Sequence, residues 1–249
     1  MTCSLQLFQS LTVMQKALFR YWIILWLVAA CLFLYPINTF LLRVGLLLSW
    51  LGVWAGCFVF GRRQKILCSA LLVAPLLVVA FLICPGRAYD RLQLRDAYVH
   101  TLRSYEGTRY IWGGENRFGI DCSGLVRAGL IKSSFREALR TFNPRLARFA
   151  LSLWWHDASA EALGQEYRHQ TKHLIAAANL NELDQNKIMP GDIAVTVSGV
   201  HVMAYLGNSQ WIEADPDLRK VVIVQTPERE NPWFQETFKI LRWRELDME

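Results

Sequence analysis

The first 86 residues are mostly apolar, whereas the rest of the chain mixes apolar and polar positions. Three apolar stretches stand out, at about residues 21–37, 44–60 and 66–85. Each is close to the roughly 20 residues that an α-helix needs to cross a hydrocarbon core of about 30 Å. Short turns at residues 36–39 and 61–65 separate them. The pattern predicts a three-helix transmembrane anchor within residues 1–86.

One short motif within this region has another interpretation. Val28-Ala-Ala-Cys31 is similar to a lipoprotein processing site. A cleaved signal peptide is normally followed by polar mature sequence, but here the apolar run continues past Cys31. This continuation favours an uncleaved membrane helix.

The net charge of +6 lies entirely in the apolar region. No Asp or Glu precedes Asp90, and the remainder of the chain balances 21 basic against 21 acidic residues. A neutral polar domain argues against a nucleic-acid partner, which would require a basic surface. The five bases on the N-terminal side of the membrane outnumber the four on the other side, which are Arg43, Arg87, Arg91 and Arg95. This difference predicts a cytoplasmic N-terminus and a C-terminal domain on the outer face. The five bases are Lys16, Arg20, Arg62, Arg63 and Lys65.

Residues 87–249 have the pattern of a folded α+β domain. Short apolar runs at 193–197, 200–206, 210–214 and 221–224, separated by turn residues, predict an antiparallel sheet. Residues of about 133–186 are predicted to form an extra helical insertion, divided into two helices at Asn143-Pro144. Its basic and aromatic side chains are compatible with a membrane-surface helix, a lid over a cleft, or two ordinary packed helices.

Cys122 is the only cysteine in the polar part of the chain, and its surroundings favour a nucleophile. Asp121 is a suitable N-cap for a helix running through residues 125–139, which places Cys122 in the first helical turn. Unpaired N–H groups and the positive end of the helix dipole favour thiolate over thiol at that position. The sequence therefore predicts a reactive cysteine that still requires a base.

His201 is the best candidate for that base, because it lies in a predicted strand. A hairpin loop of odd length centred on Gly207 would place Glu213 directly opposite His201. Glu213 could then orient one imidazole nitrogen while the other faces Cys122, as in covalent catalysis by a nucleophile and a base. A shift of one residue would move Glu213 to the wrong face.

No metal or organic cofactor is predicted. His169 and His173 are four residues apart, a spacing that binds metal on some helices. Neither a suitably placed Glu nor cysteines accompany them, so we expect both histidines to be solvated residues on a polar helix.

Several motifs together resemble the NlpC family of bacterial cell-wall cysteine peptidases. They are Gly107-Thr-Arg-Tyr-Ile-Trp-Gly-Gly114, Asp121-Cys-Ser-Gly-Leu-Val126, Pro190-Gly-Asp192 and His201-Val-Met-Ala-Tyr-Leu-Gly207. The resemblance covers about residues 90–242. It implies a papain-like α+β fold and substrates that are the short peptides of peptidoglycan.

The resemblance also implies roles for individual residues. Cys122 matches the nucleophile and His201 the base, while Glu213 stands where the family usually has His. Tyr110 matches a tyrosine that lines the site and supports the oxyanion. Three further residues of the same block are implied in substrate binding, namely Trp112, Asp121 and Ser123.

The sequence thus predicts a multi-pass protein of the bacterial cytoplasmic membrane. Its partners would be the lipid bilayer and peptidoglycan peptides, and its reaction hydrolysis of amide bonds through Cys122, His201 and Glu213. One alternative is a lipid acyltransferase or thioesterase that uses the same Cys–His chemistry at the bilayer surface. Another is a binding or scaffold module that has lost activity.

Overall fold

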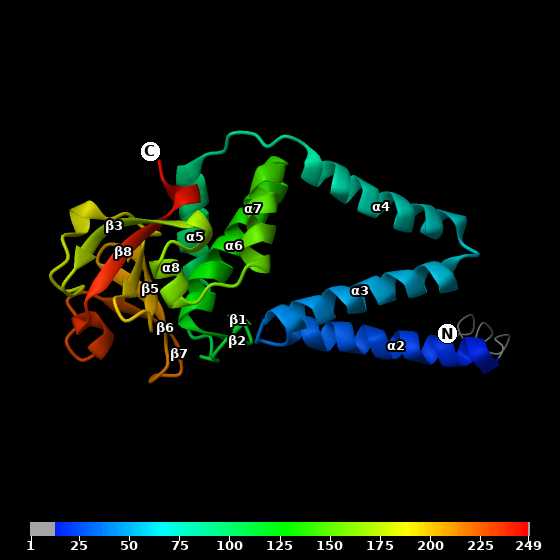
Figure 1. The fold of residues 1–249 in the computed structure, drawn as a ribbon, viewed down its shortest axis with the longest axis horizontal. Helices are drawn as coiled ribbons and strands as arrows, with labels where there is room; N and C mark the ends of the chain where they lie inside the picture. The colour runs from blue at the N-terminus through cyan, green and yellow to red at the C-terminus, as the bar shows by residue number, and fades with distance from the viewer. Residues whose placement is uncertain (1–12, 249) are drawn as a thin grey trace. The chain divides into compact units, whose positions relative to one another are not determined.

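The computed structural model describes residues 13–248, and the chain divides into two compact units (Figure 1). Unit 1 comprises residues up to Tyr35 together with Thr39–Phe81. Unit 2 comprises Pro36–Asn38 and the chain from Leu82 onward. The part of the predicted anchor that precedes Val13 lies outside the described residues.

Three long apolar helices account for the N-terminal region: α2 (Val13–Leu34), α3 (Phe40–Gly61) and α4 (Lys65–Ile83). Their most apolar windows have mean hydropathies of 2.1, 1.9 and 2.9, so each is long and apolar enough to cross a membrane. The predicted three-helix architecture is confirmed. Helix α2 begins at Val13, earlier than the predicted start near residue 21, and its first turns include the two bases Lys16 and Arg20.

Close approach of α2 and α3 depends on two glycines of α3. A side chain at Gly52 would collide with Leu25, and one at Gly56 with Trp22. Small residues of this kind let membrane helices approach closely. The indole Nε1 of Trp22 donates to the Val53 carbonyl oxygen at 3.0 Å, which adds a polar contact to this packing. None of the residues of α4 is buried.

Unit 2 is built on a six-stranded antiparallel sheet of order β3-β8-β4-β5-β6-β7. Its helix α5 (Arg91–Arg103) packs on α6 (Cys122–Thr141), and α6 packs on β5 and β6. The strands are β3 (Thr171–Ala177), β4 (Ile193–Thr196), β5 (Val202–Gly207), β6 (Gln210–Asp215), β7 (Lys220–Gln225) and β8 (Phe238–Trp243). A separate two-stranded ribbon pairs β1 (Glu115–Asn116) with β2 (Gly119–Ile120). The predicted α+β class with an antiparallel sheet is confirmed.

The four predicted strands correspond to β4–β7, whereas β3 and β8 were not predicted. Strand β3 lies within residues 133–186, so the expectation of an all-helical insertion is wrong for that part. Its Thr171 and Ala177 are buried, because β3 pairs with β8 and becomes the edge of the main sheet.

The part of the segment that precedes β3 is mostly helical, as predicted. Helix α6 ends at Thr141, and α7 (Pro144–Trp155) begins after Phe142 and Asn143. Phe142 adopts a left-handed conformation, and the Asn143 side chain caps α7 by accepting from the Arg145 N–H. A short helix, α8 (Ala160–Gly164), follows.

Candidate active site

Cys122 is the first residue of α6, where the sequence predicted it. Asp121 caps the helix: its Oδ1 accepts from the Gly124 N–H at 2.6 Å and from the Ser123 hydroxyl at 3.0 Å. Its Oδ2 accepts from the Gly113 N–H at 2.7 Å. Asp121 therefore joins the glycine-rich loop to the start of α6, and three hydrogen bonds hold its carboxylate.

His201 is 2% exposed and lies just before β5. The buried side chain of Thr196 holds its backbone on both sides. Oγ1 of Thr196 accepts from the His201 N–H at 3.0 Å and donates to the His201 carbonyl oxygen at 3.3 Å. The sequence did not single out Thr196, which fixes the position of the imidazole through the main chain.

Glu213 contacts His201, although not through the pairing predicted. The strands pair Ala204 with Ile212, so Met203 rather than His201 is opposite Glu213. The register thus differs from the prediction by two residues, and a β-bulge lies between Tyr205 and Gly207. A shift of two preserves the face of the strand. His201 Nε2 and Glu213 Oε2 lie 2.6 Å apart, and Glu213 is fully buried.

Nε2 faces Glu213, so Nδ1 is the imidazole nitrogen left for the thiol. Burial lowers the pKa of His201, but hydrogen bonds to Cys122 and Glu213 and the charges of both raise it, to about 9 overall. The opposing effects differ because burial penalises the imidazolium, whereas two acidic partners stabilise it.

Two residues that the sequence did not indicate complete this cluster. Asn231 donates through Nδ2 to Glu213 Oε1 at 2.6 Å, so both oxygens of Glu213 have partners. Trp233 stacks on the His201 ring with centroids 4.3 Å apart. Asn231 also caps the short helix η3 (Pro232–Gln235) by accepting from the Trp233 N–H. The one sequence signal at these residues is Asn231-Pro-Trp233, which is typical of a capped helical turn.

Tyr110 is half-buried and lies near Cys122. Burial raises its pKa, and the negative charges of Cys122, Asp121 and Asp215 raise it further. The phenol is therefore protonated at neutral pH, so it can donate a hydrogen bond to an oxyanion.

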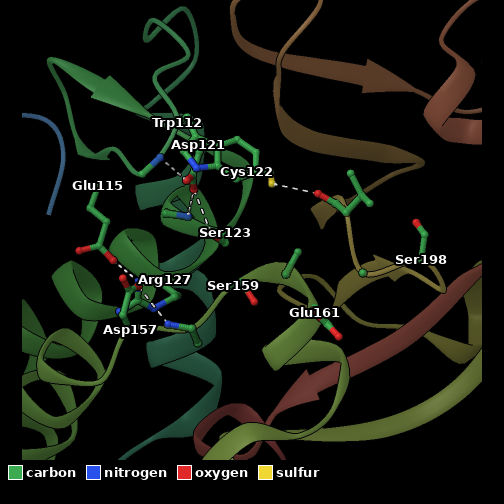
Figure 2. Close-up of a pocket in the computed structure, with 16 residues that line it drawn as sticks. Trp112, Glu115, Asp121, Cys122, Ser123, Arg127, Asp157, Ser159, Glu161 and Ser198 are labelled. Carbon is green, nitrogen blue, oxygen red and sulfur yellow. Dashed lines mark hydrogen bonds and ion pairs between the residues drawn. The ribbon is translucent and has the colours of Figure 1, made fainter. Parts of the chain in front are cut away.

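A cleft of about 580 Å³ contains Cys122. Trp112, Asp121 and Ser123 line it, so the structure brings together the residues implied in substrate binding (Figure 2). Trp112 is 76% exposed. Ser159 and Glu161 belong to the wall across from Cys122 in Figure 2.

Arg127 attaches this opposite wall to α6. It is 1% exposed, and its Nη1 donates to Glu115 and, at 2.5 Å, to Asp157 Oδ1. Its Nη2 donates to the carbonyl oxygens of Leu153 at 2.9 Å and His156 at 3.2 Å. A single buried guanidinium thus connects helix α6, the end of α7 and strand β1.

Glu115 has a second partner within unit 2. Asn38 Nδ2 donates to Glu115 Oε2 at 2.6 Å, and the Glu115 N–H donates to the Pro36 carbonyl oxygen at 2.9 Å. Ile37 forms a β-bridge with Gly114. Residues 36–38 therefore support the loop that carries Trp112 at the cleft.

Within residues 13–248, the structure shows no group of three or more His, Cys, Asp or Glu placed to hold a metal ion. His169 ends the short helix η1 (Tyr167–His169), whereas His173 lies on strand β3. The two histidines do not share a helix, so the expectation of a polar helix here is wrong.

Comparison with known families agrees with this geometry. The sequence model of the NlpC/P60 family matches residues 107–242, more than half of the chain. The chain belongs to the NlpC/P60 family. Members of this family are cysteine peptidases and amidases with the papain-like fold described above.

Solved structures with similar folds include NlpC2 from Trichomonas vaginalis, with 18% identity and a TM-score of 0.39. The match covers 66% of this chain and 50% of that protein, so this chain spans half the length of NlpC2. The peptidoglycan hydrolase RipB from Mycobacterium tuberculosis has 20% identity and a TM-score of 0.39, with coverage of 61% and 65%. The P60 domain of an antigen from M. avium subspecies paratuberculosis has 20% identity and a TM-score of 0.36, with coverage of 60% and 95%. No curated protein matches this chain.

Proposed function

We propose that this protein is a membrane-anchored cysteine hydrolase that cleaves amide bonds in the stem peptides of peptidoglycan. Membership of the NlpC/P60 family supports a cell-wall peptidase. The observation that carries the proposal is the buried cluster in which His201 contacts Glu213 at 2.6 Å, with Cys122 near enough to raise the pKa of the imidazole.

The proposed reaction begins with attack of the Cys122 thiolate on the carbonyl carbon of the scissile amide. The tetrahedral oxyanion accepts a hydrogen bond from the Tyr110 hydroxyl. His201, protonated at neutral pH, gives its proton to the leaving amine as the C–N bond breaks. Water, deprotonated by His201, then hydrolyses the thioester and releases the acid. Glu213 holds the imidazole through Nε2 and stabilises its charge throughout.

We propose that Trp112, Asp121 and Ser123 contact the substrate, because all three line the cleft. The carboxylate of Asp121 already accepts three hydrogen bonds, so its contribution to a substrate amine is electrostatic. Trp112 is the most exposed of the three and offers an apolar platform for a bound peptide.

We further propose that α2, α3 and α4 cross the bacterial cytoplasmic membrane with the N-terminus in the cytoplasm. The catalytic unit then lies on the outer face, where peptidoglycan is. The bases near the N-terminus and in the loop after α3 support this orientation.

The test uses the full chain in lipid nanodiscs, incubated with purified muropeptides whose products are identified by mass spectrometry. New peptides should form with the native chain and not with Cys122→Ala. If no peptide forms while Cys122 still reacts with a thiol probe, the substrate class is wrong and an acyltransferase or thioesterase is favoured. If Cys122 fails to react as well, the protein is not a cysteine hydrolase.

A further inference from the structure

The chain that leaves α4 is held against α7 by side chains at two positions. Arg148 Nη1 donates to the carbonyl oxygens of Leu82 at 2.6 Å and Cys84 at 2.8 Å. Asn143 donates through Nδ2 to the Arg87 carbonyl oxygen at 2.9 Å and accepts from the Arg87 N–H at 3.3 Å. Residues 82–87 therefore run antiparallel to the first half of α7.

These contacts set the depth of α7 if α4 crosses a bilayer. Helix α4 ends at Ile83, so the carbonyls of Leu82 and Cys84 lie where hydrocarbon meets the headgroups. Arg148 is hydrogen-bonded to both and lies at the same depth.

The outer face of α7 has the composition of an interfacial helix. Arg148, Leu151 and Trp155 are spaced i, i+3, i+7 and so form one stripe. Leu151 is 42% exposed, and the rings of Trp154 and Trp155 have centroids 6.2 Å apart. The other face is buried in the domain through Leu146, Ala150 and Leu153. Arginine with exposed leucine and tryptophan is typical of helices that lie in the plane of the headgroups.

The charge of Arg148 is not balanced by a carboxylate in the part of the chain that the structure describes. Its hydrogen-bond partners are the two backbone carbonyls. Arg145, one turn earlier, differs in this respect: its Nη2 lies 3.4 Å from Glu245 Oε2, and its guanidinium stacks on Tyr89. At headgroup depth, the counterion available to Arg148 is a lipid phosphate.

We propose that residues 148–155 of α7 form a membrane contact, in which Leu151 and Trp155 enter the headgroup–acyl boundary and Arg148 binds the phosphate of an anionic phospholipid. Arg127 holds the carbonyls of Leu153 and His156, at the same end of α7. The cleft wall that begins at Asp157 therefore starts at the bilayer surface.

The experiment uses the full chain in nanodiscs, with its six native cysteines replaced by alanine and one new cysteine carrying a bimane fluorophore. Leu151→Cys reports on α7. Lys187→Cys is the matched control, on η2 (Gln185–Lys187), whose Gln185 side chain bonds to Ser209 and Thr226. Quenching by lipids with a headgroup nitroxide is measured in discs with phosphatidylglycerol and in discs of phosphatidylcholine alone.

We expect quenching at position 151 to exceed that at position 187 several-fold, and to be stronger with phosphatidylglycerol. Arg148→Glu should remove most of the difference, Arg148→Lys should keep it, and Arg229→Glu, an exposed charge reversal elsewhere, should not change it. Equal quenching at positions 151 and 187 would overturn the membrane contact. Quenching at 151 that ignores both phosphatidylglycerol and Arg148→Glu would overturn the assignment of Arg148 to anionic lipid.

Discussion

Two polar clusters, each centred on a buried side chain, lie beside the same cleft, and they differ in whether a proton can move. In the first, His201 joins Glu213 and Cys122, and every member is titratable. In the second, Arg127 joins Glu115 and Asp157, and an arginine does not lose its proton in a protein. In both, the central side chain forms a hydrogen bond with a buried carboxylate. Only the cluster around His201 includes a group, the Cys122 thiol, that can react with a substrate.

Burial alone does not identify a catalytic group. Arg127 and His201 are equally hidden from solvent, at 1% and 2% exposed. Under the proposed function, Arg127 holds the cleft together and His201 takes part in the chemistry at Cys122. Substitutions in the first cluster should therefore change rate more than stability, and those in the second should change stability first.

The largest effect is expected at the nucleophile. Cys122→Ala should lower kcat/KM for muropeptide cleavage by at least about 10⁴-fold, because no other group supplies the covalent step. The thermal midpoint should change little, since the substitution removes a single sulfur atom at a helix start. Mass-spectrometric rates and thermal unfolding of the same sample check both. Residual activity within about 10-fold of the native chain would remove Cys122 from the mechanism.

Arg127→Met should give the largest loss of stability. It removes the buried guanidinium that Glu115 and Asp157 share, which should cost about 3–5 kcal/mol of unfolding free energy. Chemical denaturation of unit 2 within the full chain measures this change. The double variant Arg127→Met with Glu115→Gln also removes the buried carboxylate charge and should recover part of the loss. If Arg127→Met proves neutral, the cluster does not hold the cleft.

Glu213→Gln tests the orienting carboxylate. Gln has nearly the same shape but cannot stabilise the imidazolium, so kcat should fall by roughly 10²–10³-fold. KM should change little, because Glu213 is buried behind His201 and does not line the cleft. Steady-state kinetics separate the two parameters. Glu161→Gln, on the exposed cleft wall, is the matched control and should affect KM more than kcat.

The pKa of His201, about 9 instead of its usual 6.5, predicts how rate and stability depend on pH. A raised pKa means that the folded state holds the proton more tightly than the unfolded state. This stabilisation is complete below about pH 6.5 and disappears as pH rises through about 9. Activity should fall on the alkaline side near the same pH, as the imidazolium is lost. Glu213→Gln should move that fall to lower pH; a fall at an unchanged pH would assign the titration to another group.

Asn231→Ala should have the smallest effect of the series. It leaves Glu213 Oε1 without its donor, which should cost about 1–3 kcal/mol of stability. The carboxylate still holds His201 through Oε2, so kcat should fall by only about 10-fold. Asn231→Asp would place a second carboxylate against Glu213, and its stability should be lower than that of Asn231→Ala at neutral pH. The opposite order would show that the Asn231 amide does not donate to Glu213.

Local features of the sequence determined a large part of this protein. Long uninterrupted apolar stretches predict the three helices because a helix satisfies its own backbone and needs only length and apolarity to suit a bilayer. Asp121 as N-cap placed Cys122 at the start of α6, since capping depends on neighbouring residues alone. Alternation and turn residues likewise predicted β4–β7.

Only the tertiary structure decided features that depend on long-range pairing. Strand β3 has no clear alternation of apolar and polar residues. It forms a strand because it pairs with β8, which lies far along the chain. Gly207 pairs with Gln210, so the β5–β6 turn lies at Asn208-Ser209, and with the β-bulge beside it the register differs by two residues from a hairpin centred on Gly207. Asn231 and Trp233 reach the His201–Glu213 pair from a distant loop. Such contacts leave no local pattern, because the residues that make them need only be close once the chain has folded.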